Sequence, residues 1–296
     1  MDGFINLNKP SGITSRDAVN IVKRVLPKKT KIGHAGTLDP LAQGVLVVAI
    51  GSVTRLIEYA QEGRKTYRAE FLLGKQSETE DIESELIELV NPPIPTRQEL
   101  EDAGKKWTGK ILQKPPIYSA LKINGLPAYK RARNGEDVEL TPREITIYSA
   151  SLLEYDYPVM KWELICSSGT YVRSWGRDVA FSAGSAAVMS ALLRTRVGNF
   201  ALEDSAAPEP GKPVLLPDTP EGTDGYALLP PLWGIGQMER VTISESQLFD
   251  LRLGRFILKT FTTQTPAPWA GLDGAGELKA ILVQRPDGSV QALKNL

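Results

Sequence analysis

The sequence is poor in the residues that build covalent cross-links and metal clusters. Its 296 residues include one cysteine, Cys166, and one histidine, His34. One cysteine excludes an internal disulfide, and one histidine beside one cysteine leaves no ordinary zinc cluster. A catalytic triad of the serine hydrolase type could be built only around His34. The sequence therefore predicts chemistry that does not depend on a zinc ion.

The chain also lacks long apolar runs. No stretch of about 18 uncharged apolar residues occurs, and the N-terminus has no apolar core of a secretory signal. The 21 prolines interrupt the chain further. We therefore expect a cytoplasmic protein with no membrane partner. Its length is enough to bury a sizeable core and to form about two domains.

The chain also carries no net charge, because 35 Lys and Arg balance 35 Asp and Glu. This balance argues against indiscriminate binding of polyanions. The charges are nevertheless segregated: residues 1–75 hold twelve basic against six acidic side chains, residues 105–143 nine against three, and residues 76–104 one against nine. Solvated faces would explain any single block. Two basic blocks with Tyr118, Tyr129 and a Lys-Arg-Ala-Arg run nearby favour a nucleic-acid partner.

Hydrophobic periodicity predicts both helices and strands in the first part of the chain. Thr14 opens a capping box, and apolar residues follow at helical spacing until Pro27. The apolar run at residues 45–50 is short and rich in β-branched side chains, which predicts a buried strand. We expect Ser52 or Thr54 to cap a helix after that strand.

The same signals continue further along the chain. Residues 67–73 alternate as in a half-buried strand, and residues 96–99 form a second capping box. Strands are predicted at residues 144–153 and 161–167, the second running into a helix that begins near Thr170. Strands mixed with helices, without a regular βαβ period, favour an α+β fold with a mixed sheet.

Composition changes after residue 205. Residues 206–231 are dense in Pro, Gly and acidic side chains, which predicts a linker or an insertion. Residues 232–296 carry a helical patch and a strand-turn-strand pattern around Asp287-Gly288, a hairpin signal. We therefore divide the chain into a main domain at residues 1–205, a linking segment, and a small β-rich C-terminal domain.

A few polar residues could carry chemistry. Asp39 ends a glycine-rich stretch and precedes Pro40, which favours extended backbone at Asp39. Taken alone, such an aspartate is more often a turn-former or a helix cap, and Tyr67 fits a core strand as well as a ligand platform. Arg173 could pair with a carboxylate in a cleft and keep it ionised against the effect of burial. His34, near glycines, is expected to be exposed.

Six segments carry a family resemblance. They are INLNKPSGITS (residues 5–15), GHAGTLDPLAQGVL (33–46), KTYRAEFLLGKQSETEDIES (65–84), QKPPIYSALKINGLPAYKRARNG (113–135), CSSGTYVRS (166–174) and LLRTRVGNF (192–200). Together, and in this order, they resemble the bacterial tRNA pseudouridine-55 synthases of the TruB family. The resemblance implies the pseudouridine synthase fold, a mixed and mainly antiparallel sheet flanked by helices. The pattern at residues 240–255 and the hairpin after it resemble a small PUA-like C-terminal domain.

The resemblance also implies an activity. The T-loop uridine of tRNA at position 55 would be isomerised to pseudouridine without a cofactor or a metal. Separately from the resemblance, we expect the protein to act as a monomer. Because the target lies inside a folded loop, it would be flipped out at a cost of a few kcal/mol. Stacking on an aromatic side chain can return about 1–3 kcal/mol. An activated carboxylate suits chemistry at the anomeric carbon of the sugar, as in glycosidases.

Position by position, the resemblance assigns roles to individual residues. Asp39 would be the nucleophile, Tyr67 would stack on the base and take the C5 proton, and Arg173 would pair with Asp39. Other residues would serve the substrate: Asp81 in the Arg173 network, Tyr171 and Leu192 at the uracil, His34 in the space that the flipped nucleotide leaves, and Lys9 as a backbone or structural contact. Cys166 should be inert.

Two departures from the family pattern stand out. The family usually has Leu-Arg-Arg-Thr where this chain has Leu192, Leu193, Arg194 and Thr195, so one cation is missing from a stretch expected to face RNA. Gly176 stands where an alanine is usual and should weaken its helix by about 1 kcal/mol.

Two alternatives remain open. An RNA-binding or RNA-folding module could keep the scaffold without the reaction, although binding alone does not need a desolvated carboxylate facing a polyanion. A synthase that acts on a different RNA would share all of the chemistry.

Overall fold

The computed structural model describes residues 1–119, 121–123, 126–128, 131, 134, 136, 140–215, 224–236, 238–258 and 261–296. Tyr129 and three members of the Lys-Arg-Ala-Arg run, at positions 130, 132 and 133, lie outside these residues. Residues 216–223 of the predicted linking segment also lie outside them.

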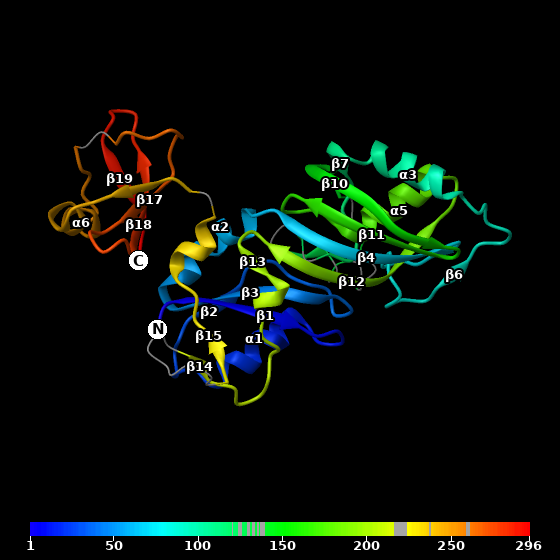
Figure 1. Cartoon of the computed structure of the whole chain (residues 1–296), viewed down its shortest axis with the longest axis horizontal. Coiled ribbons are helices and arrows are strands. Elements are labelled where there is room, and N and C mark those ends of the chain that lie inside the picture. Colours follow the sequence, from blue (N-terminus) through cyan, green and yellow to red (C-terminus); the bar gives the residue numbers. More distant parts are fainter. Residues whose placement is uncertain are drawn as a thin grey trace.

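A nine-stranded sheet runs through the centre of the described chain (Figure 1). Its order is β1-β3-β12-β4-β11-β10-β7, with β2 beside β3 and β13 beside β12. The strands are β1 Gly3–Lys9, β2 Ile32–His34, β3 Gln43–Ile50, β4 Lys65–Leu73, β7 Gly109–Gln113, β10 Arg143–Asp156, β11 Val159–Cys166, β12 Ala187–Val197 and β13 Phe200–Ala201. Only the β3–β12 pair of this sheet is parallel. The predicted mixed, mainly antiparallel sheet is thus confirmed.

Three helices pack into one apolar cluster on one face of the sheet. They are α1 Ser15–Lys23, α3 Arg97–Lys106 and α5 Val172–Ser182. The first two begin at the predicted capping boxes of Thr14 and Thr96. Alternation along β3 sends Leu46 and Val48 into this cluster, while Val45 and Val47 enter a second cluster on the opposite face. The uninterrupted apolar run at residues 45–50 is therefore buried on both faces.

The helix after β3 differs from the prediction. A 3₁₀ segment, η1 Gly51–Leu56, follows the strand directly and leads into α2 Ile57–Glu62, and neither segment has a side-chain cap. Ser52 is not a cap because it lies inside the 3₁₀ segment, where the carboxylate of Asp2 accepts a hydrogen bond from its amide. Thr54 instead donates to the carbonyl of Gly51, at 2.8 Å.

The two halves of the sheet meet at the short parallel pair of β3 and β12. Only Leu193 with Gln43 and Arg194 with Gly44 are in register there. A Cβ added to Gly44, which has φ 102°, would lie 2.2 Å from the carbonyl oxygen of Arg194. Glycine is required at this position because the two backbones approach so closely.

The segment that follows the sheet returns along the edge strand β1. The amide of Asn8 donates to the carbonyl of Ala206, at 2.8 Å, and the amide of Phe4 donates to that of Leu229, at 2.9 Å. Between these points lies a short parallel pair, β14 Val214–Leu215 and β15 Tyr226–Ala227. Smaller described elements elsewhere are β5 Lys75–Gln76, β6 Ile87–Glu88, β8 Lys122–Ile123, β9 Leu126–Pro127, η2 Leu202–Asp204 and η3 Pro231–Ile235.

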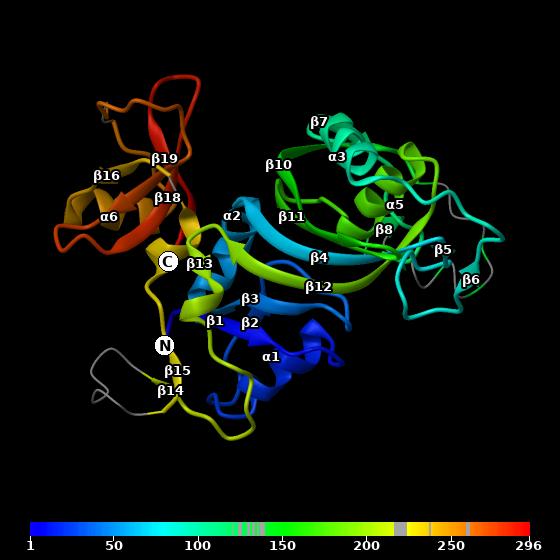
Figure 2. The same cartoon turned by 45° about the vertical axis from the view of Figure 1, so that its right-hand side comes forward.

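The C-terminal unit is a four-stranded sheet with one helix, set at one end of the molecule (Figure 2). It comprises β16 Arg240–Thr242, α6 Glu245–Arg252, β17 Trp269–Leu272, β18 Leu278–Gln284 and β19 Val290–Asn295. The β18–β19 hairpin matches the predicted strand-turn-strand pattern. Among the described helices, none has both the length and the apolar character needed to cross a membrane.

Candidate active site

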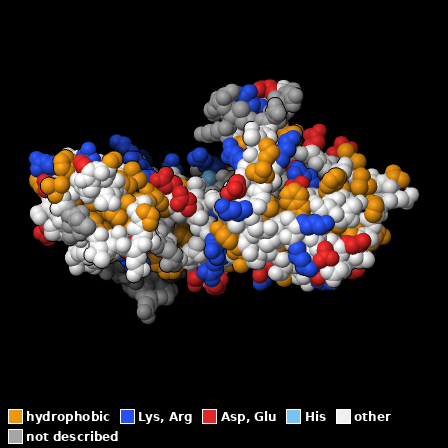
Figure 3. Space-filling view, turned by 90° about the horizontal axis from the view of Figure 1, so that it is seen from above, with side chains coloured by type: hydrophobic (Ala, Val, Ile, Leu, Met, Phe, Trp, Pro, Cys, Tyr) orange, Lys and Arg blue, Asp and Glu red, His pale blue; other side chains and the backbone are white. Residues whose placement is uncertain are grey.

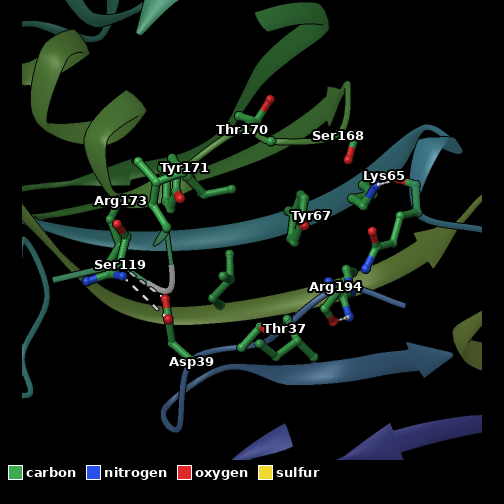
Figure 4. A pocket seen from close by; sticks show the side chains of 17 residues that line it. Thr37, Asp39, Lys65, Tyr67, Ser119, Ser168, Thr170, Tyr171, Arg173 and Arg194 are labelled. Atoms are coloured by element: carbon green, nitrogen blue, oxygen red, sulfur yellow. Dashed lines mark hydrogen bonds and ion pairs between the residues drawn. The ribbon is translucent and has the colours of Figure 1, made fainter. Parts of the chain in front are cut away.

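A pocket of about 440 Å³ opens where the two halves of the sheet meet, a volume typical of small-ligand sites. The loop before β3, the strands β4 and β12 and the segment that leads into α5 all contribute to its lining. Figure 4 shows Asp39 and Arg173 at one end, Tyr67 in the middle, and Lys65 and Arg194 at the other end. The three residues that the sequence singled out for chemistry therefore share one cavity.

Asp39 and Arg173 form an ion pair through two contacts. The Nε atom of Arg173 lies 3.1 Å from Oδ2 of Asp39, and Nη2 lies 3.4 Å from Oδ1. The guanidinium is buried, whereas 35% of the Asp39 side chain is exposed. The planar fork of arginine suits such a paired contact. It fixes the direction of the carboxylate and leaves part of its surface open to the pocket.

Arg173 also binds a second carboxylate. Its Nη1 atom lies 3.1 Å from Oδ2 of Asp81, of which 1% of the side chain is exposed, and donates to the carbonyl of Thr79 at 2.5 Å. Nη2 donates to the carbonyl of Tyr118 at 3.1 Å. Asp81 in turn accepts from the hydroxyl of Thr79 and the amide of Glu83. The guanidinium is thus held rigidly from the side opposite Asp39.

The loop that carries Asp39 is fixed by the segment between β1 and α1. The hydroxyl of Ser15 accepts from the amide of Leu38 at 2.8 Å and donates to its carbonyl at 3.1 Å. Lys9, which is fully buried, donates to the carbonyls of Pro10, Ile13 and Pro40. Lys9 therefore contacts backbone and does not line the pocket. This segment holds Asp39 in place before any ligand arrives.

Burial is the main influence on the Asp39 carboxylate. It raises the pKa of Asp39, and the positive charge of Arg173 opposes the rise, while Asp81 adds to it. A carboxylate in a partly dry pocket is more reactive toward a positively charged centre than one in water, since fewer waters screen it. Asp39 therefore suits attack on an electron-poor carbon.

Tyr67 lies on β4 with its side chain buried at the pocket. Burial raises the pKa of its phenol, and the charge of Arg194 opposes this rise. Leu192 and Tyr171 line the same pocket, as predicted. The amide side chain of Gln113 holds Tyr171 by accepting from its amide and donating to its carbonyl, both at 2.9 Å.

Sequence reasoning missed two cations in the pocket, Lys65 and Arg194. Both are buried, with 6% and 1% of their surface exposed. The alternation of side chains along a strand could have indicated both residues, because positions two apart lie on the same face. Lys65 precedes Tyr67 by two positions, and Arg194 follows Leu192 by two. The stretch at residues 192–195 was expected to face RNA, but no role was assigned to Arg194, whose side chain lines the pocket. Leu193, where the family has a cation, points to the other face and pairs with Arg68.

His34 is half-buried instead of exposed. Its strand, β2, pairs with β3, and His34 lies opposite Val48. Burial lowers the pKa of His34, and the charges of Arg16 and Arg194 lower it further. Its Nδ1 atom is buried without a hydrogen-bond partner in the described structure. His34 does not line the pocket that holds Asp39.

Cys166 is fully buried, and burial raises its pKa to about 11. The thiol therefore stays protonated at neutral pH and is a poor nucleophile. The residues that the structure describes contain no group of three His, Cys, Asp or Glu side chains placed to hold a metal ion.

Figure 3 shows Lys and Arg side chains around the hollow near the centre of one face of the molecule, with a few Asp and Glu side chains among them. The carboxylate, the aromatic ring and the basic surroundings can together receive an anionic ligand that carries a flat ring and an electron-poor carbon.

Comparison with known proteins gives consistent matches. Residues 23–172 match the family model described as TruB family pseudouridylate synthase, N-terminal domain. The tRNA pseudouridine synthase B of Streptococcus gordonii is 38% identical over 296 residues, covering 97% of each chain. That of Streptococcus sanguinis is 40% identical over 268 residues, covering 87% of this chain and 88% of the relative. That of Rhodopirellula baltica is 46% identical over 208 residues, which span 69% of this chain and 60% of the relative.

Solved structures support the same fold. The crystal structure of a Cbf5-Nop10-Gar1 complex matches with a TM-score of 0.67 and 24% identity, over 95% of this chain and 78% of that chain. An archaeal box H/ACA sRNP Nop10-Cbf5 complex matches with a TM-score of 0.69 and 21% identity, over 99% of this chain and 85% of that chain.

Proposed function

The chain belongs to the TruB family of pseudouridylate synthases, and on this premise we propose that it isomerises the T-loop uridine at position 55 of tRNA to pseudouridine. The relatives that match it are named tRNA pseudouridine synthase B. The single observation that carries the proposed mechanism is the paired contact of Arg173 with Asp39 in the pocket that also contains Tyr67. The substrate would be the T-stem-loop of tRNA, bound by a monomer in the cytoplasm.

The reaction begins with the uridine flipped into the pocket and its ring stacked on Tyr67. A carboxylate oxygen of Asp39 forms a bond to C1′ of the ribose while the bond from C1′ to N1 breaks, and the electron pair stays on the uracil. The uracil then turns so that C5 faces C1′. C5 attacks C1′ and displaces the oxygen of Asp39 with its electron pair.

Two proton movements complete the isomerisation. The proton on C5 leaves to Tyr67, which then passes it to water, and N1 takes up a proton from water. Burial raises the pKa of Tyr67, and the nearby charge of Arg194 opposes that rise. The product has the same atoms as the substrate, so the reaction consumes neither an oxidant nor a co-substrate. Asp81 and Lys9 act indirectly, because they hold Arg173 and the Asp39 loop. The role of His34 would be to fill the space left by the flipped nucleotide.

Replacing Asp39 tests the mechanism. Asp39→Asn keeps the shape of the side chain but removes the nucleophile, and removal of a catalytic nucleophile typically costs 10⁴-fold or more. We expect no release of tritium from an unmodified tRNA transcript labelled at C5 of its uridines. Asp156→Asn, at an exposed position on β10, is the matched control and should retain full activity. Turnover by Asp39→Asn would remove Asp39 from the reaction.

The same assay tests the target. A transcript with cytidine in place of uridine 55 should release no tritium with the wild-type protein. Release from this transcript would show that the protein acts on a different uridine. Tight binding of the unaltered tRNA by the wild-type protein without tritium release would favour an RNA-binding module that lacks the reaction.

A further inference from the structure

The pocket contains two cations that the mechanism above leaves without a direct role. Lys65 and Arg194 lie together at the end of the pocket away from Asp39, with Tyr67 between (Figure 4). Arg194 is in register with Tyr67 across the β4–β12 pair, and Lys65 lies two positions before Tyr67 on the same face of β4.

Neither cation has an acidic partner within the described part of the chain. Lys65 donates to the carbonyls of Gln61 and Gly63, at 2.5 and 3.0 Å. Arg194 donates to the carbonyls of Val45 and Gly36, at 2.7 and 3.1 Å. Arg173, at the other end, contacts two carboxylates. The cationic end of the pocket, defined here as Lys65 and Arg194, therefore carries positive charge that the protein does not neutralise.

Such an arrangement is unfavourable in the empty protein. Burying an unpaired cation costs free energy, and two adjacent cations repel each other. Accordingly, burial lowers the pKa of Lys65 to about 8, and the charge of Arg194 contributes to the decrease. At neutral pH Lys65 remains mostly protonated. The cost is recovered when an anion enters the pocket, so the site is organised for a negative charge that arises there.

The proposed reaction creates such a charge. When the bond between N1 and C1′ breaks, its electron pair leaves with the uracil, and the negative charge spreads from N1 over O2, O4 and C5. We propose that Lys65 and Arg194 stabilise this uracil anion while it is detached from the sugar. This assignment rests on the proposed function and adds two residues to it.

The symmetry of the uracil rotation explains why two cations, and not one, would stabilise the detached ring. Turning the ring about its N3–C6 axis exchanges N1 with C5 and also O2 with O4. Two oxygens therefore point to the same side of the pocket before and after the turn. A pair of fixed cations opposite Asp39 can hold the anion in both orientations and keep it from diffusing away. Because these cations contact the charge only after bond cleavage, they lower the barrier more than they strengthen substrate binding.

Charge-removing variants test this assignment. Lys65→Met and Arg194→Gln each remove one cation, and Arg68→Gln and Arg196→Gln are matched controls on the same two strands, at exposed positions. We expect the single-turnover rate on tRNA to fall about 10²- to 10³-fold in the first two variants, as for loss of one oxyanion-hole donor. The dissociation constant for tRNA should change by less than about two-fold. The controls should match the wild type, and thermal unfolding should show that each variant is folded.

Replacing the target uridine by 5-fluorouridine gives a second test. A purely structural role of the two cations would give the same rate deficit on both bases. Fluorine at C5 withdraws electrons, so the anion of 5-fluorouracil needs less stabilisation than that of uracil. On tRNA with 5-fluorouridine at position 55, the rate deficit of Lys65→Met should be at least ten-fold smaller than with uridine. The readout is loss of the N1–C1′ bond, measured by chromatography of the digested RNA. It does not depend on removal of a C5 proton, which separates the effect from the role of Tyr67.

Three outcomes would overturn the assignment. Equal deficits on both bases would show that the cations do not act on the ring anion. A weaker dissociation constant with an unchanged rate would show that they bind a phosphate of the RNA. Unchanged rates would remove them from the reaction. In all three cases the wild-type protein still forms pseudouridine, whereas a wild type that forms none would reject the proposed function itself.

Discussion

Arg173 is the residue on which the charge state of the pocket depends. It joins Asp39 to Asp81, and it opposes the effect of burial on Asp39. If the nucleophile must be ionised, the rate falls as the pH falls through the pKa of Asp39, which burial has raised. Any weakening of the contact between Arg173 and Asp39 should raise the pKa of Asp39 further. The acidic limb of the pH–rate profile should then move to higher pH.

Arg173→Lys tests this coupling. Lysine keeps one positive charge but cannot contact Asp39 through a planar fork. We expect a lower single-turnover rate, by about 10-fold or more for the loss of one charge-assisted contact, and an acidic limb displaced to higher pH. The measurement is the single-turnover rate from pH 4.5 to 8, with Arg68→Lys as the control. An unchanged limb would mean that Arg173 does not set the ionisation of Asp39.

At the scale of single residues, the sequence indicated the functional residues at the Asp39 end of the pocket but not the two cations at the other end. Asp39, Tyr67 and Arg173 lie in quoted motifs, and their side chains do line one cavity. Lys65 and Arg194 lie in the same motifs, but their burial depends on the pairing of β4 with β12. That pairing joins segments more than a hundred residues apart and has no local signal. The alternation of side chains along each strand was the only available hint.

The helix α5 shows how packing reverses a rule of local propensity. By propensity alone, Gly176 weakens the helix relative to alanine. In the folded chain the ring of Phe71, on β4, lies against the backbone of the helix at this position. A Cβ on Gly176 would lie 2.0 Å from an atom of that ring. The expectation of a weaker helix is therefore wrong for the folded protein, because the glycine makes room for the contact between α5 and the sheet.

Gly176→Ala should therefore destabilise the protein. Overpacking of this kind typically costs about 1–3 kcal/mol. Phe71→Leu should relieve the clash, so the double variant should be less destabilised than the sum of the two single variants. Urea unfolding of the four proteins measures the coupling. A more stable Gly176→Ala variant would show that the backbone of α5 can move away from the sheet at little cost.

Elements with local signals were predicted well, and those fixed by distant segments were not. The capping boxes of α1 and α3 and the alternating strand β4 agree with the prediction because a few neighbouring residues determine them. The start of α2 was mispredicted because a 3₁₀ segment that contains both Ser52 and Thr54 follows β3 directly, and Asp2, from the beginning of the chain, binds the amide of Ser52. β12 was missed because it is fixed mainly by its pairing with β4, more than a hundred residues earlier in the chain.

At the scale of the whole molecule, the C-terminal unit is joined to the main sheet by apolar contacts. Ala270, Leu278 and Ile281 belong to the same buried cluster as Val47 and Leu56, on the face of β3 opposite α1. Polar contacts flank this cluster. Lys294 forms an ion pair with Glu58, and Arg55 donates to the carbonyl of Asn295 at 2.6 Å. The sequence suggested a separate small domain, and nothing local in it indicated this shared core.

A shared core predicts that the two parts unfold together. Leu278 is 6% exposed and lies in that cluster, so Leu278→Ala should cost about 2–4 kcal/mol through the cavity it leaves. Calorimetry should show one transition in the wild type and one transition at a lower temperature in the variant, because loss of the contact lowers the stability of the whole cooperative unit. Leu258→Ala, at a position that is 86% exposed, is the control and should leave the transition unchanged. Two resolved transitions in the wild type would contradict this prediction. They would mean that the C-terminal unit unfolds independently of the main sheet, despite the apolar contacts between them.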